Sequence, residues 1–227
     1  MIEFNDVGLE TDKSCIIKRI IEQLSIPKDG SNYRLSYHKN KFLIECIDEK
    51  FKTSFSIDEL MRDEDKIFTK LFPYNGGSIL DCTAGLGRDG ILLSRLGFNV
   101  TMIEKNPLLV LIIKNYLSKN KHIKSKLLYG DSLSFVRLAN KQFDYIYIDF
   151  MFEKKNNSKP SKYDLFLRSI NYNESNKLYF IDEMISYCKK RLIVKEPIKS
   201  QSDINNHDFE IKTKLIKYKI FNGKSAK

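Results

Sequence analysis

The stretch from Ser78 to Asp89 constrains the fold of this chain more than any other. It reads S-I-L-D-C-T-A-G-L-G-R-D, in which an apolar run ends at Asp81 and a turn containing Gly85 and Gly87 follows. A helix is expected next, over about residues 88–96. Glycines let the backbone turn tightly and approach a ligand, and a helix start offers free N–H groups. The stretch therefore predicts a strand, a glycine turn and a helix that together form a nucleotide site.

The chain after this stretch alternates between strand-like and helix-like segments. Strands are expected at 78–82, 99–104, 126–129, 143–149 and 191–195, and helices at 107–118, just after 131–132 and at 177–188. Two further strand-like runs, 209–212 and 215–221, are too close in sequence for a helical crossover, so we expect them to pair antiparallel. The alternation favours an α/β fold with an open, mostly parallel sheet.

Residues 1–74 are expected to form a small α+β domain ahead of a ligand-binding domain at 75–227. Apolar residues have helical spacing over 16–24 and again over 56–71, and the run 34–47 resembles a pair of strands around His38. The turn residues Pro-Tyr-Asn-Gly-Gly at 73–77 mark the boundary.

The charge of the chain favours a polyanionic partner. There are 39 basic and 29 acidic residues, a formal net charge of +10. Nucleic acid is the first expectation and a membrane surface the second. The alternative is that many lysines are simply solvated. The chain is also rich in Ile and Asn, and a coding bias would enrich all three residue types together.

Cysteine usage and the N-terminal sequence point to a reducing, cytoplasmic location. The four cysteines are far apart in sequence and form no C-x-x-C motif, so neither a disulfide framework nor a zinc site is expected, and no other metal site is predicted. The N-terminus lacks the features of a signal peptide. The longest purely aliphatic run, 108–113, is too short to cross a bilayer.

Several candidate ligand contacts lie around the glycine turn. Gly85, Gly87 and Gly90 fit G-x-G-x-x-G, a pattern that would also suit a nicotinamide dehydrogenase. Asp81, however, is placed to hold an amino group or an ordered water rather than a pyrophosphate. Arg88 and Asp89 put a charged pair at the helix start. Asp89 is equally typical of a first-turn helix acid.

Acidic residues also end the next two strands. Glu104 ends the second strand, where an acid grips ribose hydroxyls, although it could be a surface charge. Lys105 beside it covers the ligand or is solvated. Asp131 and Ser132 follow the third strand and could reach an adenine amino group. A helix N-cap role for either residue is as good an interpretation.

The fourth strand ends in Asp149-Phe150-Met151-Phe152. An acid followed by aromatic residues suits an unpaired base, because the carboxylate binds base N–H groups and a ring stacks on the base, worth about 1–3 kcal/mol. We interpret Met151 as core and Phe152 as the stacking ring, with ordinary core packing as the alternative. The lysines that follow are expected to contact phosphates unless they belong to a solvated loop. These are Lys154, Lys155, Lys159 and Lys162.

Four motifs give the chain a resemblance to a known family. L-D-C-T-A-G-L-G-R-D-G, M-I-E-K-N-P, Y-I-D-F-M-F and K-R-L-I-V-K-E-P occur in this order from residue 80 to residue 197. They are similar to the RsmJ family of S-adenosylmethionine-dependent methyltransferases, which act on guanine N2 in small-subunit (16S) ribosomal RNA. The resemblance runs from about residue 78 to residue 221.

The resemblance implies a class I methyltransferase fold, a Rossmann-like seven-stranded sheet whose last hairpin is antiparallel. It implies S-adenosylmethionine as cofactor and ribosomal RNA, free or in the assembled small subunit, as partner, with no membrane. The implied cofactor contacts are Arg88-Asp89, Glu104-Lys105, Asp131-Ser132 and Asp149. Family members have Asp-Pro-Met-Phe where this chain has Phe150 after Asp149. Catalysis is expected from Asp149 and the Phe150 carbonyl, which would orient the target amine, with Phe152 stacking on the base.

Three other functions remain open from the sequence. The first is methylation of another amine, such as adenine N6 in DNA or RNA, or of a protein amide. The second is a nicotinamide dehydrogenase, favoured only by the glycine pattern. The third is a non-catalytic RNA-binding protein with a degenerate site.

Overall fold

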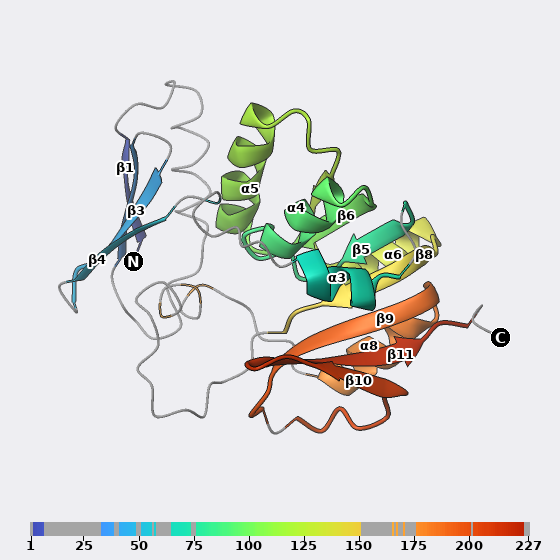
Figure 1. Cartoon of the computed structure of the whole chain (residues 1–227). Helices are drawn as coiled ribbons and strands as arrows, with labels where there is room; N and C mark the ends of the chain where they lie inside the picture. The colour runs from blue at the N-terminus through green and yellow to red at the C-terminus, as the bar shows by residue number, and fades with distance from the viewer. Residues whose placement is uncertain are drawn as a thin grey trace.

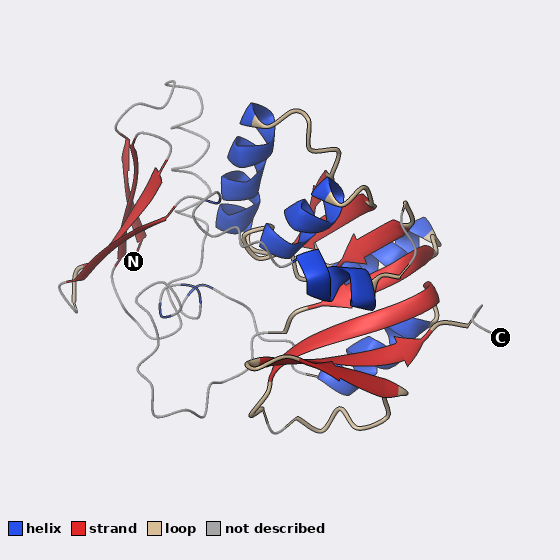
Figure 2. Cartoon of the chain, viewed as in Figure 1, coloured by secondary structure: helices blue, strands red, loops and turns tan. Residues whose placement is uncertain are grey.

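The fold is described from a computed structural model of the chain (Figure 1; Figure 2). The structure describes residues 2–6, 33–38, 41–48, 51–55, 57, 65–73, 76–150, 165, 167, 170, 176–200 and 202–224. The helix expected over 16–24 and the basic segment after the fourth strand lie outside the described residues.

The larger sheet has seven strands, in the order β10-β11-β9-β8-β5-β6-β7. Its strands are β5 (Ser78–Asp81), β6 (Asn99–Glu104), β7 (Lys126–Tyr129), β8 (Phe143–Ile148), β9 (Cys188–Pro197), β10 (Phe209–Lys212) and β11 (Ile216–Asn222). Neighbours from β7 to β9 pair parallel, whereas β11 pairs antiparallel with both β9 and β10. The predicted α/β fold with an antiparallel C-terminal hairpin is confirmed.

Helices cover both faces of this sheet (Figure 1). They are α3 (Asp65–Leu71), α4 (Arg88–Arg95), α5 (Pro107–Lys119), α6 (Ser132–Ala139) and α8 (Lys177–Ile185). Successive residues of β8 alternate between two buried clusters: Tyr145 and Tyr147 pack with α3, α4 and α5, while Ile146 packs with α6 and α8. Both faces are therefore dry, which explains the unbroken apolar run of β8. None of the helices described in the structure is long and apolar enough to span a membrane.

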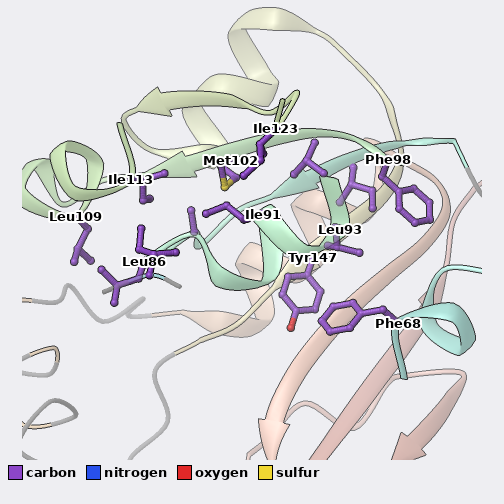
Figure 3. Packing of buried hydrophobic residues seen from close by; sticks show 14 of the residues in the cluster. Phe68, Leu86, Ile91, Leu93, Phe98, Met102, Leu109, Ile113, Ile123 and Tyr147 are labelled. Carbon is purple, nitrogen blue, oxygen red and sulfur yellow. The ribbon is translucent and has the colours of Figure 1, made fainter. Parts of the chain in front are cut away.

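The first cluster joins the glycine turn to the helices above it (Figure 3). Leu86 from the turn, Ile91 from α4 and Met102 from β6 are all at most 5% exposed. Phe68 of α3 lies beside Tyr147, with ring centroids 6.3 Å apart. Burying such side chains stabilises the fold by about 1.5–3 kcal/mol each. The turn is thus held rigidly against the sheet by apolar packing.

One predicted helix is shorter in the structure. The expected helix 177–188 ends at Ile185, because the Tyr187 N–H closes a last turn onto the Met184 carbonyl at 3.0 Å. The Tyr187 carbonyl then accepts the Phe143 N–H at 2.9 Å, which joins the chain to the sheet. Strand β9 therefore begins at Cys188, earlier than the expected residue 191.

The N-terminal residues form a second sheet of four strands in the order β1-β2-β3-β4. These are β1 (Ile2–Asp6), β2 (Tyr33–His38), β3 (Lys41–Cys46) and β4 (Phe51–Phe55). The strand pair predicted around His38 is confirmed as the antiparallel β2–β3 hairpin. Strands β1 and β4 were not expected. Helix α3 covers the end of the helix predicted over 56–71, and the domain boundary at residues 74–75 stays a prediction.

Candidate functional site

A pocket of about 240 Å³ lies where the parallel strands end. The carboxyl ends of parallel strands meet at one edge of the sheet, and ligands bind there. The predicted residues that line this pocket are Asp81, Gly85, Arg88, Asp89, Glu104, Lys105, Asp131, Ser132, Asp149 and Phe150. Segments separated by up to about 70 residues in sequence are thus brought to one site by the order of the strands.

The glycine turn presents bare backbone to this pocket. Gly85 has φ +58°, and a Cβ there would meet only the Thr83 carbonyl oxygen, at 3.9 Å, so the space beside it is open. Gly87, at φ +74°, is different, because its Cβ would lie 3.3 Å from the Ile113 side chain of α5. Gly87 lies outside the pocket lining, and what it provides is the close approach of two helices.

The absence of a side chain at Gly90 leaves space for the Asp81 carboxylate. A Cβ at Gly90 would lie 2.6 Å from the Met102 sulfur and 2.9 Å from Oδ2 of Asp81. Any side chain there would push α4 away from β6 and displace the carboxylate. The third glycine of the motif therefore serves the packing of helix on strand, and through it the position of Asp81.

Asp81 is a buried carboxylate with little hydrogen bonding. It is 2% exposed, and its Oδ1 accepts the Thr83 N–H at a long 3.3 Å. Burial, and secondarily the charge of Asp89, raise the pKa of Asp81 well above its ordinary value. A buried carboxylate that is so weakly paired is costly and would gain from a cationic ligand group.

Glu104 is buried and holds two turns in place. Its Oε2 accepts the Gly85 N–H and its Oε1 accepts the Asn106 N–H, each at 2.7 Å. Burial raises its pKa, and these two N–H groups oppose the rise. With 6% exposure, the surface-charge alternative for Glu104 is wrong. Each carboxylate oxygen can accept a second hydrogen bond, so the ribose contact stays a prediction.

Asp131 caps the helix that follows β7. Its Oδ1 accepts the Ser134 N–H at 2.8 Å at the start of α6, which confirms the N-cap interpretation. Ser132 is 4% exposed and interacts with the Cys82 thiol. A contact of Asp131 or Ser132 with adenine stays a prediction.

Asp149 belongs to a network of charges in the pocket. Lys195 of β9 places its ammonium 2.9 Å from Oδ2 of Asp149 and 2.6 Å from Oδ2 of Asp89. The Tyr147 hydroxyl donates to the same Asp89 oxygen at 2.6 Å. The Asp149 side chain is nevertheless 41% exposed, so it faces the pocket as well as the network.

The pKa values in this network follow from its charges. Burial works against ionised Asp89, but Lys195 and the Tyr147 hydroxyl hold the pKa of Asp89 below its ordinary value. For Asp149, burial raises the pKa, Lys195 lowers it and Asp89 raises it, with a net rise. The two carboxylates raise the pKa of Lys195, although burial opposes this, so Lys195 stays protonated.

Phe150 lines the pocket, and its side chain packs in the core beside it. Its ring is 5% exposed and meets the Phe180 ring of α8 edge to face, with centroids 5.7 Å apart. The Lys177 ammonium lies 5.5 Å from the Phe150 ring centroid. This packing anchors the chain directly after Asp149. Met151, Phe152 and the four predicted RNA-binding lysines (Lys154, Lys155, Lys159 and Lys162) lie outside the described residues, so their roles stay predictions.

The sequence did not single out Lys195, Tyr147 or Lys177, all of which line the pocket. For Lys195 a signal was present, because it lies near the carboxyl end of a predicted parallel strand, as Asp81 and Asp149 do. Tyr147 gave no such signal, because a tyrosine in an apolar strand is most simply interpreted as core.

The pocket fits S-adenosylmethionine, which carries a sulfonium and an amino-acid group. The weakly paired carboxylate of Asp81 suits a cationic group. Arg88 also lines the pocket, and its buried Nε has no hydrogen-bond partner among the described residues, which suits an anionic group. The bare backbone at Gly85 leaves room for the ligand. The residues present therefore fit this cofactor.

Curated relatives are small-subunit ribosomal RNA methyltransferases by name. "Ribosomal RNA small subunit methyltransferase J" of Coxiella burnetii is 32% identical over 127 residues, covering 53% of this chain and 50% of the relative. The protein of the same name from Buchnera aphidicola is 28% identical over 212 residues, covering 87% of this chain and 80% of the relative. The chain thus matches only about half the length of the Coxiella protein.

A solved structure and a family model agree with these relatives. The SAM-dependent methyltransferase NGO1261 from Neisseria gonorrhoeae superposes with a TM-score of 0.64 at 17% identity, covering 100% of this chain and 98% of that one, which shows the shared fold. The family model described as "Putative SAM-dependent methyltransferase" matches residues 66–223. The chain therefore belongs to this family of S-adenosylmethionine-dependent methyltransferases, with S-adenosylmethionine as its cofactor, and the resemblance to the RsmJ family is confirmed.

Proposed function

We propose that this protein methylates the exocyclic N2 of a guanine in small-subunit ribosomal RNA. The observation that carries the proposal is the position of Asp149. Its carboxylate is half-exposed in the cofactor pocket, directly after β8 and beside the glycine turn. An acid in this place can accept N–H groups of a base while the base amine faces the cofactor. The names of the curated relatives supply the class of RNA.

Asp149 would act by orientation and by charge. The lone pair of guanine N2 is delocalised into the ring, so the amine is a poor nucleophile. Hydrogen bonds from its N–H groups to Asp149 and to the Phe150 carbonyl would direct the lone pair, and alignment of this kind contributes several kcal/mol. The Asp149 charge would also stabilise the positive charge that develops on the amine.

The cofactor supplies an electrophilic methyl group, and the protein does the positioning. Asp81, Arg88 and the Gly85 backbone would hold the cofactor. Phe150 would keep its own carbonyl in place, because its ring is packed against Phe180. The amine proton would leave to water, since the Asp149 carboxylate is engaged by Lys195 and by the amine that it would orient.

A basic surface supports an RNA partner. The residues from Lys105 to Gly130, all described in the structure, contain no Asp or Glu. The exposed lysines among them are Lys114, Lys119, Lys121, Lys124 and Lys126. Lysine contacts to phosphates release counterions, so RNA affinity should fall steeply as salt rises. Reversing the charge of the last four should weaken RNA binding and flatten that dependence on salt.

The test is methyl transfer from radiolabelled S-adenosylmethionine to small ribosomal subunits that lack the modification. The expected result is label recovered as N2-methylguanine in the RNA. Asp149→Ala should abolish transfer and retain some cofactor binding. The matched control is Asp182→Ala, which removes an exposed aspartate of α8 outside the pocket lining and should transfer at the wild-type rate.

The outcomes separate this function from its alternatives. Label in N6-methyladenine or in protein would replace guanine N2 by another amine. Cofactor binding without any transfer, together with RNA binding, would favour the non-catalytic RNA-binding protein. Wild-type turnover by Asp149→Ala would show that the assignment of Asp149 is wrong.

A further inference from the structure

The pocket contains one lysine that joins two carboxylates from different elements. Lys195 comes from β9, Asp149 follows β8 and Asp89 lies in the first turn of α4. The N–O distances of 2.6 and 2.9 Å are those of charge-assisted hydrogen bonds. The proposed function assigns this lysine no role in positioning Asp149.

The sheet itself puts Lys195 beside Asp149. Val194 of β9 pairs with Ile148 of β8 in the parallel register. Lys195 and Asp149 are the next residues of the two strands' chains, so they lie side by side. The Asp149 backbone is also fixed, because its N–H donates to the Thr83 hydroxyl at 2.7 Å. Backbone and carboxylate of Asp149 are therefore held separately, by Thr83 and by Lys195.

Negative charge is crowded around Asp149. Asp89 of α4 and Asp81 of β5 both interact with it unfavourably, and the neutral Tyr147 of β8 faces the same space. Lys195 of β9 and Arg88 of α4 oppose this crowding. Lys195 is the one in contact with the carboxylate, and its side chain is only 21% exposed, so solvent screens it weakly.

We propose that Lys195 is a positioning residue for the reaction, which holds Oδ2 of Asp149 so that Oδ1 is directed to the target amine. This inference rests on the proposed function, because it assigns Asp149 the role of amine acceptor. The bridge to Asp89 fixes the ammonium from a second side. Lys195 also lowers the pKa of Asp149 and so favours its ionised form, which is the form that accepts N–H groups.

A purely structural ion pair would have different consequences. It would affect folding stability and leave the turnover of the folded protein unchanged. A positioning residue affects kcat, and it shifts the pH dependence of the carboxylate that it contacts. The two roles are therefore separated by kinetics of folded variants and by the titration of Asp149.

The experiment compares three variants of the full chain. Lys195→Met removes the charge and keeps much of the side-chain length, and Lys195→Arg keeps the charge. The matched control is Lys190→Met, which removes another β9 lysine that pairs with a β8 aspartate, Asp144, at 3.4 Å outside the pocket. Folding is checked by circular dichroism and cofactor affinity by calorimetry.

Lys195→Met should lower kcat about 100-fold, since a misplaced contact group costs about that much. The cofactor Kd should change less than about threefold, and Lys195→Arg should recover much of the rate. Removing the cation raises the pKa of Asp149, so the acid limb of the kcat profile should move to higher pH. Lys190→Met should match the wild type in rate and in pH profile.

A second variant keeps the test valid if Lys195→Met does not fold. Asp89→Asn removes the carboxylate that raises the pKa of Asp149, so the acid limb should move in the opposite direction, to lower pH. A wild-type kcat and an unshifted profile in Lys195→Met would overturn the proposal, as would an unshifted acid limb in Asp89→Asn.

The titration of Asp149 also separates this inference from the proposed function. Carbon NMR of the Asp149 carboxyl, in the protein bound to S-adenosylhomocysteine, needs no RNA and no turnover. A higher pKa in Lys195→Met than in the wild type supports the contact, whether or not ribosomal RNA is the substrate. An equal pKa in the two proteins would refute the contact even if the wild type methylates RNA.

Discussion

Two neighbouring residues of β9 are the centres of two different charge networks. Lys195 faces the pocket and pairs with Asp89 and Asp149. Glu196 is 0% exposed and pairs with Lys217 and Lys219, each at 3.4 Å. Successive side chains of a strand point to opposite faces, so one strand supplies both networks.

The network of Glu196 is closed. Its two carboxylate oxygens also accept hydroxyl groups from Ser200 and Ser202. Lys219 donates in turn to the Ser202 hydroxyl and to the Ile204 carbonyl, which ties the segment after β9 to β11. The network of Lys195, by contrast, includes a carboxylate that is 41% exposed. A closed network stabilises a structure, whereas a partly open one can bind something else.

The largest expected effect is the loss of stability when the closed network is broken. Glu196→Ala leaves the buried Lys219 and the partly buried Lys217 without their carboxylate, which should cost about 3–5 kcal/mol of the free energy of unfolding. Urea denaturation measures this. As control, Glu210→Ala breaks a more exposed pair with Lys212 and should cost less than about 1 kcal/mol. Equal losses in the two variants would contradict the comparison.

A smaller effect of opposite sign is expected at the open site. Burial raises the pKa of Asp81, so the folded state binds a proton more tightly than the unfolded state. Stability due to this group is therefore greatest below its unfolded pKa and falls as pH rises toward its folded pKa. Asp81→Asn should raise the free energy of unfolding at pH 7 by about 1 kcal/mol and flatten its pH dependence.

The measurement is urea denaturation of both proteins between pH 4 and pH 8, without cofactor. Cofactor affinity should fall in Asp81→Asn, because the amide lacks the charge. A less stable variant, or one that binds the cofactor as tightly as the wild type, would show that Asp81 is a structural acid like Glu196.

Tyr147→Phe should have a comparable or slightly smaller effect. The ring packing is kept, while Asp89 loses the hydrogen bond from the hydroxyl. One buried hydrogen bond contributes about 0.5–1.5 kcal/mol, so thermal unfolding should show a modest drop in Tm. The pKa of Asp89 should rise, because the hydroxyl lowers it. A loss as large as that of Glu196→Ala would mean that the open network is as stabilising as the closed one.

The smallest effect is expected for the pair near the amino ends of β8 and β9. Lys190 and Asp144 lie 3.4 Å apart with side chains 39% and 25% exposed. Lys190→Met should change the free energy of unfolding by about 0.5 kcal/mol or less, and less still at high salt. A change above 2 kcal/mol in urea denaturation would undermine the ranking of the networks by burial.

Much of the larger sheet could be predicted, because strong local patterns mark its strands. The unbroken apolar run before Asp149 correctly predicted β8, and the run before the turn at Asp81 correctly predicted β5. Both strands were also expected to end at the edge of the sheet where the pocket lies. Strand β4 was missed, since Phe51–Phe55 is short and nothing in the sequence indicates that it pairs with β3.

The site was predictable where a residue type is unusual for its place. Acids at the ends of apolar strands stand out, so the sequence singled out Asp81, Glu104 and Asp149, which line the pocket. Lys195 was missed although it ends a predicted strand, because a lysine does not stand out in a lysine-rich chain and its partner Asp89 is 106 residues away. Gly87 was expected at the ligand, but its neighbour Ile113 comes from another helix, which the motif does not reveal.

The hydrogen bond between the Thr83 hydroxyl and the Asp149 N–H joins the cofactor turn to the acid that would receive the RNA base. Two ligands that order the same pair of groups are thermodynamically linked, and the linkage is reciprocal. Cofactor that orders the turn would raise the affinity for RNA, and RNA would raise the affinity for cofactor by the same factor. The protein would then hold its substrate more firmly with the cofactor bound than without it.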